Sequence, residues 1–261
     1  IPEILKGNDI LGLAQTGTGK TAAFGLPLLQ RIKSIKKGRA EPKSPRSLIL
    51  APTRELALQI HAELEKFSYK SKLYIACVIG GVGQGSQVKK LHSGLDVLVA
   101  APGRLLDLMN QGHVDLKNTE FLVLDECDRL LDMGFIPDVE RIVSLLPKIR
   151  QTLFFSATLS DEIHKIGAKF VLNPKIVEVA RVAQTASTIS QYICNTTPKS
   201  KQGQLRKLLK EEPVNNAVIF CNRKKDISSF VLIFLISLFT FGFNNSLDEN
   251  KVLFFLYKLL I

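Results

Sequence analysis

The sequence predicts an α/β fold, namely a parallel sheet with helices on both faces, followed by the start of a second α/β unit. Short apolar runs alternate with helical patterns along residues 1–180, as in chains that form helix-covered parallel sheets. The runs are apolar almost throughout, which fits strands buried on both faces. A small, polar segment at 181–188 precedes a new strand and helix pattern. We therefore expect a first domain at 1–180, a linker at 181–188 and a second domain beginning at 189–229.

Each expected strand is a short apolar run bounded by polar or turn-forming residues. The expected strands are Ile10–Ala14, Ser47–Ala51, Leu73–Ile79, Asp96–Ala100, Phe121–Asp125, Thr152–Ser156 and Ile176–Ala180. The expected helices between them are Lys20–Ile35, Glu55–Phe67, Val88–Leu91, Arg104–Asn110, Val139–Leu146 and Asp161–Val171. Pro27 has no backbone N–H, so we expect it to kink or shorten the first helix.

The second unit is predicted by a strand, helix and strand pattern that then breaks off. Its expected elements are the strands Gln191–Asn195 and Ala217–Cys221 and the helix Gln202–Leu209. Residues 230–261 differ in composition, and Phe230–Phe243 carries no charge and no periodic polar face. This apolar run is shorter than the roughly 20 residues that span a bilayer. Three interpretations remain open: a buried core segment, a membrane anchor, or an out-of-frame translation of AT-rich DNA.

Composition favours a folded domain with an anionic partner. The 261 residues are 46% apolar and 23% charged, which argues against disorder, a collagen-like chain and a disulfide-stapled miniprotein. The net charge of +11 suits nucleic acid or an anionic membrane surface. The four cysteines are far apart in the sequence, so neither a zinc site nor a disulfide framework is indicated, and a cytoplasmic location is expected. Ile1 is not a methionine, and we expect the chain to begin inside a longer protein.

One stretch is strongly basic. Residues 31–46 contain seven basic residues and one acidic residue. The stretch is interpreted either as a loop that touches RNA or as a solvated surface connector, and its composition favours the connector.

A candidate phosphate-binding loop follows the first strand and opens the first helix. Glycines allow backbone N–H groups to converge on phosphate oxygens, and the helix N-terminus adds a partial positive charge. Lys20 is expected to reach the β- and γ-phosphates, and the Thr21 hydroxyl is expected to bind Mg²⁺. The general pattern has glycine where this chain has Ala14. The loop comprises Ala14, Gln15, Thr16, Gly17, Thr18, Gly19, Lys20 and Thr21.

Three carboxylates, Asp125, Glu126 and Asp128, follow the expected strand Phe121–Asp125. At the carboxyl edge of a parallel sheet, Asp125 can hold Mg²⁺ through its water shell. Glu126 can orient and deprotonate an attacking water. A pair of acids beside a phosphate loop favours nucleotide hydrolysis over simple nucleotide storage.

Seven segments occur in a characteristic order. They are Ala14–Thr21, Pro52-Thr53-Arg54-Glu55-Leu56, Gly80-Gly81, Ala101-Pro102-Gly103-Arg104, Asp125-Glu126-Cys127-Asp128, Ser156-Ala157-Thr158 and Val218-Ile219-Phe220-Cys221-Asn222. In these segments the chain resembles the DEAD-box ATP-dependent RNA helicases of superfamily 2, bacterial members especially. The segments resemble motifs I, Ia, the double-glycine motif, Ib, II, III and IV of that family. The resemblance covers roughly residues 1–225 and implies two RecA-like domains, of which 189–229 would begin the second.

The resemblance also implies roles for individual residues. ATP and Mg²⁺ would bind the phosphate loop and the acids, with Lys20, Asp125 and Glu126 catalytic and Thr21 and Asp125 at the metal. RNA would be held through its backbone, independently of base sequence. Ser156 and Thr158 would hydrogen-bond Asp128 and couple the nucleotide site to domain closure. The implied RNA contacts are Pro52, Thr53, Arg54, Gly80, Gly81, Pro102, Gly103 and Arg104.

The chain departs from the family pattern in four places, one of which is Ala101, where the family commonly has threonine. Cys127 stands where the family usually has alanine, a small residue for a small residue, and this DECD variant marks a known subgroup. The family's adenine-reading glutamine lies upstream of motif I and is not included here. No His-Arg-x-Gly-Arg sequence follows motif IV. We therefore expect a chain truncated at both ends and nearly inactive as an ATPase. The alternative function is a catalytically inactive fragment that binds nucleotide or RNA.

Overall fold

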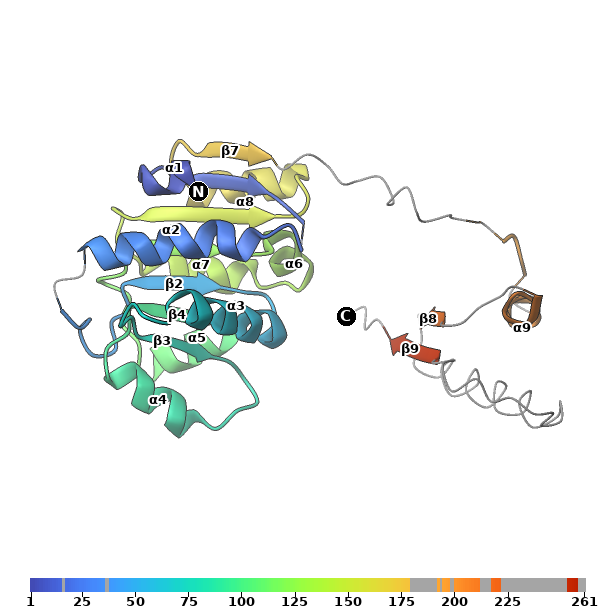
Figure 1. The fold of residues 1–261 in the computed structure, drawn as a ribbon, viewed down its shortest axis with the longest axis horizontal. Helices are drawn as coiled ribbons and strands as arrows, with labels where there is room; N and C mark the ends of the chain where they lie inside the picture. Colours follow the sequence, from blue (N-terminus) through green and yellow to red (C-terminus); the bar gives the residue numbers. More distant parts are fainter. Residues whose placement is uncertain are drawn as a thin grey trace. The chain divides into compact units, whose positions relative to one another are not determined.

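The computed structural model describes residues 1–15, 17–35, 38–178, 192, 194–197, 200–211, 217–221 and 253–257. The chain divides into two compact units, Ile1–Ala183 and Gln184–Ile261, and we describe each by itself (Figure 1). The expected linker at 181–188 lies outside the described residues, so the domain boundaries stay predictions.

The first unit contains a seven-stranded sheet in which every neighbouring pair is parallel. The strand order is β3-β4-β2-β5-β6-β1-β7. This architecture confirms the predicted parallel α/β sheet with helices, and the start of a second α/β unit stays a prediction. The strands are β1 (Ile10–Leu13), β2 (Ser47–Leu50), β3 (Ile75–Val78), β4 (Val97–Ala100), β5 (Phe121–Leu124), β6 (Gln151–Ser156) and β7 (Lys175–Glu178).

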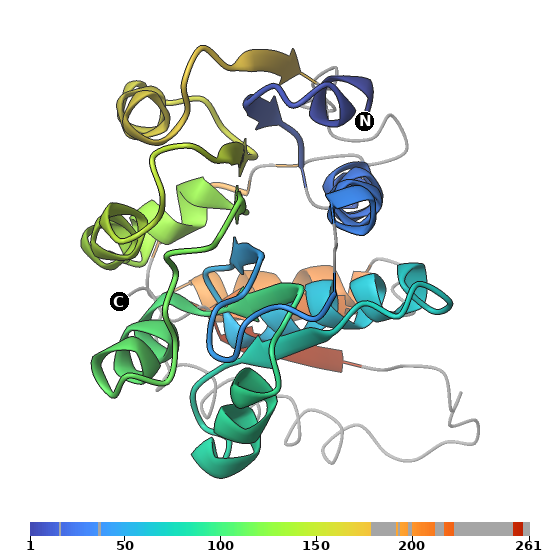
Figure 2. The ribbon, with the colours of Figure 1, turned by 90° about the vertical axis from the view of Figure 1, so that its left-hand side faces the viewer.

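Helices cover both faces of this sheet, and α2 lies on the opposite side from α7 and α8 (Figure 2). The structure has two helices that the sequence did not predict, namely α1 (Pro2–Leu5) and α6 (Cys127–Asp132). The other helices are α2 (Lys20–Ile35), α3 (Arg54–Phe67), α4 (Gln84–His92), α5 (Pro102–Asn110), α7 (Ile136–Ser144) and α8 (Asp161–Phe170).

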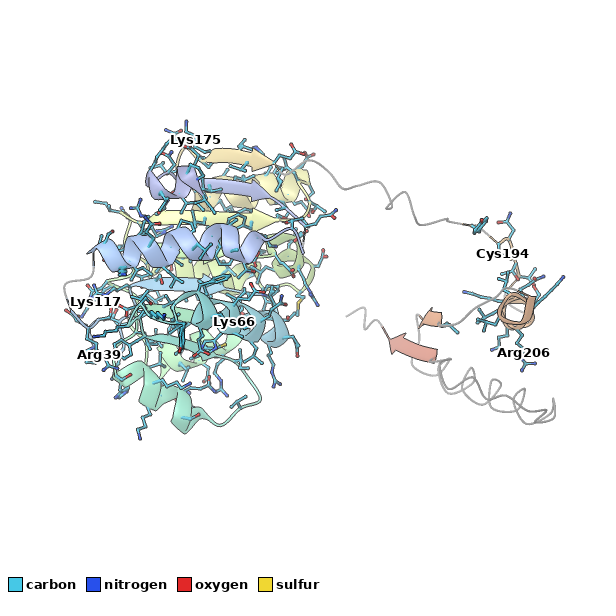
Figure 3. All side chains as sticks on the ribbon, in the orientation of Figure 1. Arg39, Lys66, Lys117, Lys175, Cys194 and Arg206 are labelled. Carbon is cyan, nitrogen blue, oxygen red and sulfur yellow. The ribbon has the colours of Figure 1, made fainter. Side chains whose placement is uncertain are left out.

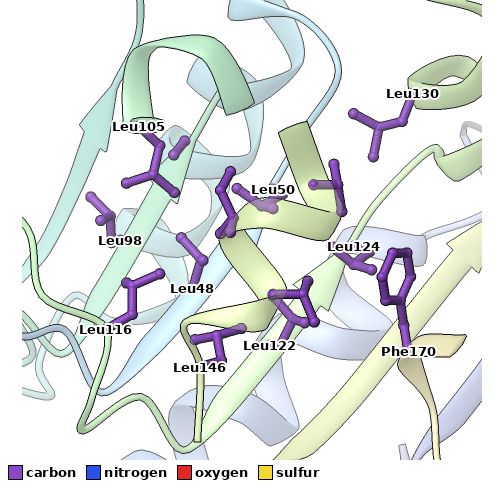
Figure 4. Packing of buried hydrophobic residues seen from close by; sticks show 14 of the residues in the cluster. Leu48, Leu50, Leu98, Leu105, Leu116, Leu122, Leu124, Leu130, Leu146 and Phe170 are labelled. Carbon is purple, nitrogen blue, oxygen red and sulfur yellow. The ribbon is translucent and has the colours of Figure 1, made fainter. Parts of the chain in front are cut away.

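Each face of the sheet has its own hydrophobic core, because successive strand side chains point to opposite faces. In β2, Leu48 and Leu50 belong to the core shared with α5 to α8. Ile49, between them, belongs to the core shared with α2 and α3. All three are fully buried, and Figure 4 shows the leucine-rich packing of the first core. Burial on both faces explains why the strands are apolar throughout.

The strand β7 is an exception to that pattern. The sequence predicts a strand at Ile176–Ala180 that is covered on both faces, but all four residues of β7 are exposed. β7 is the last strand of the sheet and pairs only with β1 among the described strands. Its apolar residues Ile176 and Val177 are 63% and 44% exposed. An apolar run alone does not distinguish a central strand from an edge strand.

Pro27 does not shorten α2, one of its two expected effects, and a kink stays a prediction. The helix continues for 16 residues with Pro27 buried inside it. A proline removes one backbone hydrogen bond, whereas Phe24, Leu28 and Ile32 bury one face of this helix in the core. Burial of that face outweighs the local loss.

In the second unit, the structure describes one helix and two strands. These are α9 (Lys201–Glu211), β8 (Ala217–Cys221) and β9 (Leu253–Tyr257), and β8 and β9 pair in parallel. Residues 192, 194 and 195 lie outside any strand, so the strand expected at Gln191–Asn195 is wrong there. The segment Phe230–Phe243 lies outside the described residues. Within the described ranges, no helix is long and apolar enough to cross a membrane.

Candidate functional site

The sheet topology brings three predicted segments to one edge. β5 and β1 both pair in parallel with β6, so the carboxyl ends of all three strands lie together. The phosphate loop follows β1, the acids follow β5, and Ser156-Ala157-Thr158 forms the end of β6 and the residues after it. Open α/β sheets bind ligands at this edge.

The phosphate loop has the backbone conformation that its glycines predict. Gly17 and Gly19 have φ angles of +86° and +79°, in the left-handed region. A Cβ built at either position meets no atom within 4 Å, so the loop leaves space beside its backbone. The Thr18 hydroxyl donates to the Gln15 carbonyl at 2.7 Å and closes the turn. Thr16 lies outside the described residues.

Lys20 and Asp125 form a buried ion pair at the centre of this edge. Lys20 Nζ lies 2.8 Å from Asp125 Oδ1, with the two side chains 5% and 1% exposed. Burial raises the pKa of Asp125, and the nearby Lys20 ammonium opposes that rise. The pair therefore places the Lys20 ammonium and the Asp125 carboxyl group side by side, next to an open, glycine-lined loop.

The residues at this edge fit a divalent cation. Asp125 Oδ2 is buried and has no hydrogen-bond partner within the described part of the chain, and such an atom costs free energy unless something pairs with it. Thr21 lies in the first turn of α2, directly after Lys20. A carboxylate oxygen and a hydroxyl, completed by water and phosphate oxygens, match the hard ligands that Mg²⁺ prefers.

Glu126 adopts an unusual backbone conformation beside the ion pair. Its φ and ψ are +51° and +55°, and it forms the N-cap of α6. Asp125 Oδ1 accepts a hydrogen bond from the Glu126 N–H at 2.9 Å, which stabilises the turn. A left-handed residue other than glycine costs about 1–3 kcal/mol, and such residues cluster at functional sites. The Glu126 side chain is buried, with Arg129 at 3.6 Å.

Asp128 connects α6 to the segment after β6, through Thr158 as predicted but through the Ala157 N–H in place of Ser156. Its Oδ2 accepts hydrogen bonds from the Ala157 N–H at 3.2 Å and from the Thr158 hydroxyl at 3.3 Å. The predicted bond from Ser156 is wrong, because the Ser156 hydroxyl is buried without a partner among the described residues. Ser156 is the last residue of β6. The contacts with Asp128 come from Ala157 and Thr158, which follow the strand.

Cys127 lies in the core beneath the acids. It is 1% exposed, and its Sγ donates a weak hydrogen bond to the Leu124 carbonyl at 3.5 Å. Burial raises the pKa of its thiol well above the ordinary value. Cys127 therefore acts as a small apolar residue at this position.

The segments expected to bind RNA lie at the ends of β2, β3 and β4. The Thr53 hydroxyl caps α3 by accepting from the Leu56 N–H at 3.2 Å, and Pro52 is buried directly before it. Arg54 is exposed, and its guanidinium lies against Gly81, where a Cβ would collide with it. Gly81 has a φ of +73°, so this position favours glycine for its conformation.

The N-terminus of α5 forms the other half of this surface. Pro102 is the first residue of α5 and is buried, and a Cβ built at Gly103 meets no atom within 4 Å. Arg104 was expected to contact RNA phosphates, but its guanidinium already has partners in the protein. Its Nε and Nη2 donate to the carbonyls of Ile79 and Val82, both at 3.3 Å.

Gln87 is a residue of this surface that the sequence did not reveal. It is 6% exposed, and its amide bonds to the loop that contains Gly80 and Gly81. The only available signal was a polar side chain on the inner face of a short helix, which is too common to be informative.

In the described part of the basic stretch, residues 31–35 and 38–46, four basic side chains contact other parts of the fold. The stretch lies at the amino-terminal end of the strands, where Figure 3 labels Arg39. This placement favours the connector over the RNA loop. The observed partners are the carbonyls of Ile4 and Leu5 for Arg31, the Tyr74 ring for Arg39, the Gly112 carbonyl for Lys43, and Asp96 for Arg46.

Comparison with known proteins assigns the family. The family described as "DEAD/DEAH box helicase" matches residues 1–166. The chain belongs to the DEAD/DEAH box helicase family. This assignment confirms the resemblance that the ordered motifs predict.

Helicases of this family from several organisms are similar to the chain. The DEAD-box ATP-dependent RNA helicase CshA of Streptococcus pneumoniae is 39% identical over 252 residues, covering 96% of this chain and 47% of CshA. DEAD-box ATP-dependent RNA helicase 14 of Arabidopsis thaliana is 39% identical over 230 residues, covering 86% and 36% of the two chains. The chain thus spans about half or less of these helicases.

A solved helicase structure supports the RecA-like fold. The crystal structure of a hypothetical ATP-dependent RNA helicase from Sulfolobus tokodaii is 28% identical, with a TM-score of 0.63. The match covers 90% of this chain and 65% of that one.

Proposed function

We propose that this chain is the part of a DEAD-box ATP-dependent RNA helicase that binds ATP with Mg²⁺ and holds RNA by its backbone. In the whole enzyme, hydrolysis of ATP would drive local separation of a short RNA duplex. The DECD form of motif II is included in this proposal, since Cys127 replaces alanine without disturbing the three carboxylates.

The buried pair of Lys20 and Asp125 beside an open glycine loop carries the proposal. A cation and an acid at the carboxyl edge, next to a helix N-terminus, are the groups that triphosphate binding requires. Lys20 would leave Asp125 and bind the β- and γ-phosphates. The +11 net charge adds a general attraction for ATP and RNA.

Different residues of the chain would have different roles in ATP hydrolysis. Bound Mg²⁺ would neutralise charge on the phosphate oxygens, held by Asp125 and Thr21. Glu126 would orient the attacking water and accept its proton. Asp128 would couple the nucleotide site to the segment after β6 through its hydrogen bonds with Ala157 and Thr158.

RNA would lie across the ends of β2, β3 and β4. The exposed guanidinium of Arg54 and the free N–H groups at the start of α5 suit phosphate oxygens. Gly80 and Gly103 leave space for close approach of a sugar-phosphate backbone. None of these groups reads a base edge, so binding would be independent of base sequence.

We further propose that these 261 residues by themselves turn over ATP slowly. They contain no His-Arg-x-Gly-Arg sequence, and an arginine supplied to the phosphates is worth about 10³–10⁵ in rate. The second candidate function, a binding fragment without turnover, is favoured by the same absence. Both functions place the chain in the cytoplasm, which remains part of the proposal.

A Lys20→Ala variant tests the site. Binding of a fluorescent ATP analogue and of a labelled single-stranded RNA would be measured for the wild-type chain and the variant. We expect the variant to lose ATP binding and any RNA-stimulated turnover while it keeps most of its RNA affinity. Equal ATP affinity in the two chains would contradict the assignment of the phosphate loop.

Turnover distinguishes the two candidate functions. RNA-stimulated ATP hydrolysis that is slow but abolished by Lys20→Ala indicates a helicase part. Binding with no hydrolysis in either chain indicates a binding fragment. Turnover equal to that of an intact two-domain relative would contradict the proposed slow rate.

A further inference from the structure

The segment between α3 and β3 exposes aromatic rings among lysines. Residues 66–74 read KFSYKSKLY, with three lysines and no acidic residue. Tyr69 and Tyr74 are 79% and 42% exposed, and they are two of the four tyrosines in the chain. Tyrosine rings contribute most to cores and interfaces. Two exposed rings so close together in the sequence therefore indicate a binding surface.

Two other segments of the chain meet this one at the amino-terminal end of β3. The guanidinium of Arg39, which precedes β2, lies over the Tyr74 ring, with Cζ 3.8 Å from the ring centroid. Lys90, in the last turn of α4, lines an open hollow of about 410 Å³ together with Tyr74 and Glu65. A hollow of this size is in the range of ligand-binding pockets. The tyrosines and lysines of these segments therefore belong to one surface.

Four lysines of this surface have charges that the protein leaves unpaired. All four are exposed, and no hydrogen bond or ion pair holds their ammonium groups within the residues that the structure describes. They are Lys66, Lys70, Lys89 and Lys90. By contrast, the exposed residues Lys6, Lys117 and Lys169 each lie within 3.2 Å of a carboxylate. The acid at the hollow, Glu65, lies 3.6 Å from His61. The surface is therefore positively charged and suits an anionic partner.

Helix dipoles explain only part of this charge. Lys66 lies in the last turn of α3, and Lys89 and Lys90 lie in the last turn of α4, where cations offset the partial negative charge of a helix C-terminus. That effect requires neither Lys70 nor an exposed tyrosine. The cores of protein interfaces are depleted in lysine, whereas single-stranded RNA is bound by cations along its backbone and by aromatic rings against its bases. The composition of the surface therefore favours RNA over a protein partner.

We propose that this surface binds single-stranded RNA and is separate from the RNA contacts proposed above. It lies at the amino-terminal ends of the strands, whereas those contacts lie at the carboxyl ends. The 14 residues of α3 span about 21 Å between the two. The lysines bind phosphates, Tyr69 stacks on a base, and Arg39 fixes the Tyr74 ring from one side. The surface comprises Lys66, Tyr69, Lys70, Tyr74, Lys89 and Lys90.

A second surface changes how the chain holds a long RNA. A strand that reaches both surfaces stays bound at one when it leaves the other, because rebinding is then intramolecular. Neither a lysine on a phosphate nor a ring on a base face reads a base edge, so this binding is independent of base sequence. Affinity should therefore increase with RNA length once the strand is long enough to reach both surfaces.

Amide chemical shifts of the full chain, titrated with a long oligouridine, map each surface separately. We expect changes at residues 66–74 and 89–92 in addition to those around Arg54 and Gly81. Changes confined to Arg54 and Gly81, or no RNA binding at all, would overturn the inference. Changes confined to 66–74 and 89–92 would support it and contradict the RNA contacts of the proposed function. Polyglutamate is the control anion, and equal binding of polyglutamate at 66–74 would overturn the inference in favour of an acidic protein.

Variants at Lys70 and Tyr69 separate charge from stacking. Lys70→Gln should reduce the slope of log affinity against log salt by about 0.7, the value for one phosphate contact on a single strand. Tyr69→Ala should weaken binding by about fivefold or more with the slope unchanged, because it removes one stacked base.

The matched control is Lys165→Gln, which removes an exposed lysine of α8 and should keep the wild-type affinity and slope. All three side chains are exposed, so stability and affinity for a fluorescent ATP analogue should stay the same in every variant. A slope in Lys70→Gln equal to that in Lys165→Gln, or wild-type affinity in Tyr69→Ala, would overturn the proposal.

Discussion

Replacing Lys20 by methionine tests the ion pair at the centre of the site. Methionine has a similar length and volume, so the main change is the loss of the positive charge 2.8 Å from Asp125. The Asp125 side chain is 1% exposed, so its carboxylate would be buried without a cation. Breaking a buried ion pair in this way costs about 3–5 kcal/mol.

Protonation of Asp125 limits that cost. Neutralising a carboxyl group with an ordinary pKa near 3.9 requires about 4 kcal/mol at pH 7. We therefore expect the free energy of unfolding to fall by about 3–4 kcal/mol at pH 7. For a domain of this size the corresponding fall in Tm is about 6–16 °C.

The pH dependence follows from the direction of the pKa shift. Burial already raises the pKa of Asp125, and loss of Lys20 raises it further. Between the unfolded and folded pKa values, the folded state binds one proton more than the unfolded state. Stability of the variant should therefore increase relative to wild type by up to about 1.4 kcal/mol for each pH unit from 7 towards 5.

Urea unfolding of the whole chain at pH 5, 6 and 7 measures these differences. The matched control is the double variant Lys20→Met with Asp125→Asn, which removes both charges. It should recover most of the lost stability while ATP binding remains absent. A Lys20→Met chain as stable as wild type at pH 7, with the same pH profile, would refute the buried ion pair.

Three further changes test other parts of the structure. A Cβ at Gly12 would lie 2.5 Å from the Phe155 ring, so Gly12→Ala should cost about 1–3 kcal/mol in urea unfolding, and Phe155→Leu in the same chain should restore part of it. Burial raises the pKa of Cys77 to about 11, so its alkylation rate, followed by mass spectrometry, should increase about tenfold per pH unit between 8 and 10, while buried Cys127 should stay unlabelled until the chain unfolds. Asp128→Asn should reduce RNA-stimulated ATP turnover and leave affinity for an ATP analogue within about twofold; a loss of analogue binding would show that Asp128 acts in the nucleotide site itself.

The strands and most helices could be predicted because burial on two faces imposes an apolar run of defined length. The predicted ends of the strands were less accurate. Leu73 and Tyr74 lie outside β3, although the apolar pattern includes them. Exposure of Ile176 was not predictable, since whether a strand is central or at an edge depends on the order of strands in the sheet. The short helices α1 and α6 contain too few residues to show a period.

The candidate site could be predicted where it depends on strand ends. Lys20 and Asp125 each follow an apolar strand, and a parallel sheet brings such positions to one edge. The partners of Asp128 and Arg104 could not be predicted in full, because they depend on shifts of one or two residues along the chain. The role of Gln87 could be recognised only from the structure, in which α4 packs against the loop that contains Gly80 and Gly81.

The place of β1 between β6 and β7 has a consequence for synthesis on the ribosome. Ile10 pairs with Leu153 and with Lys175, so among the described strands β1 has no partner until some 140 residues after it. At about 5–20 residues per second, the nascent chain waits about 7–29 s before β1 can join a sheet. During that interval β2, β4 and β5 can already pair with one another, so the strand that carries the phosphate loop joins a sheet that is largely built, and β7 then pairs with it.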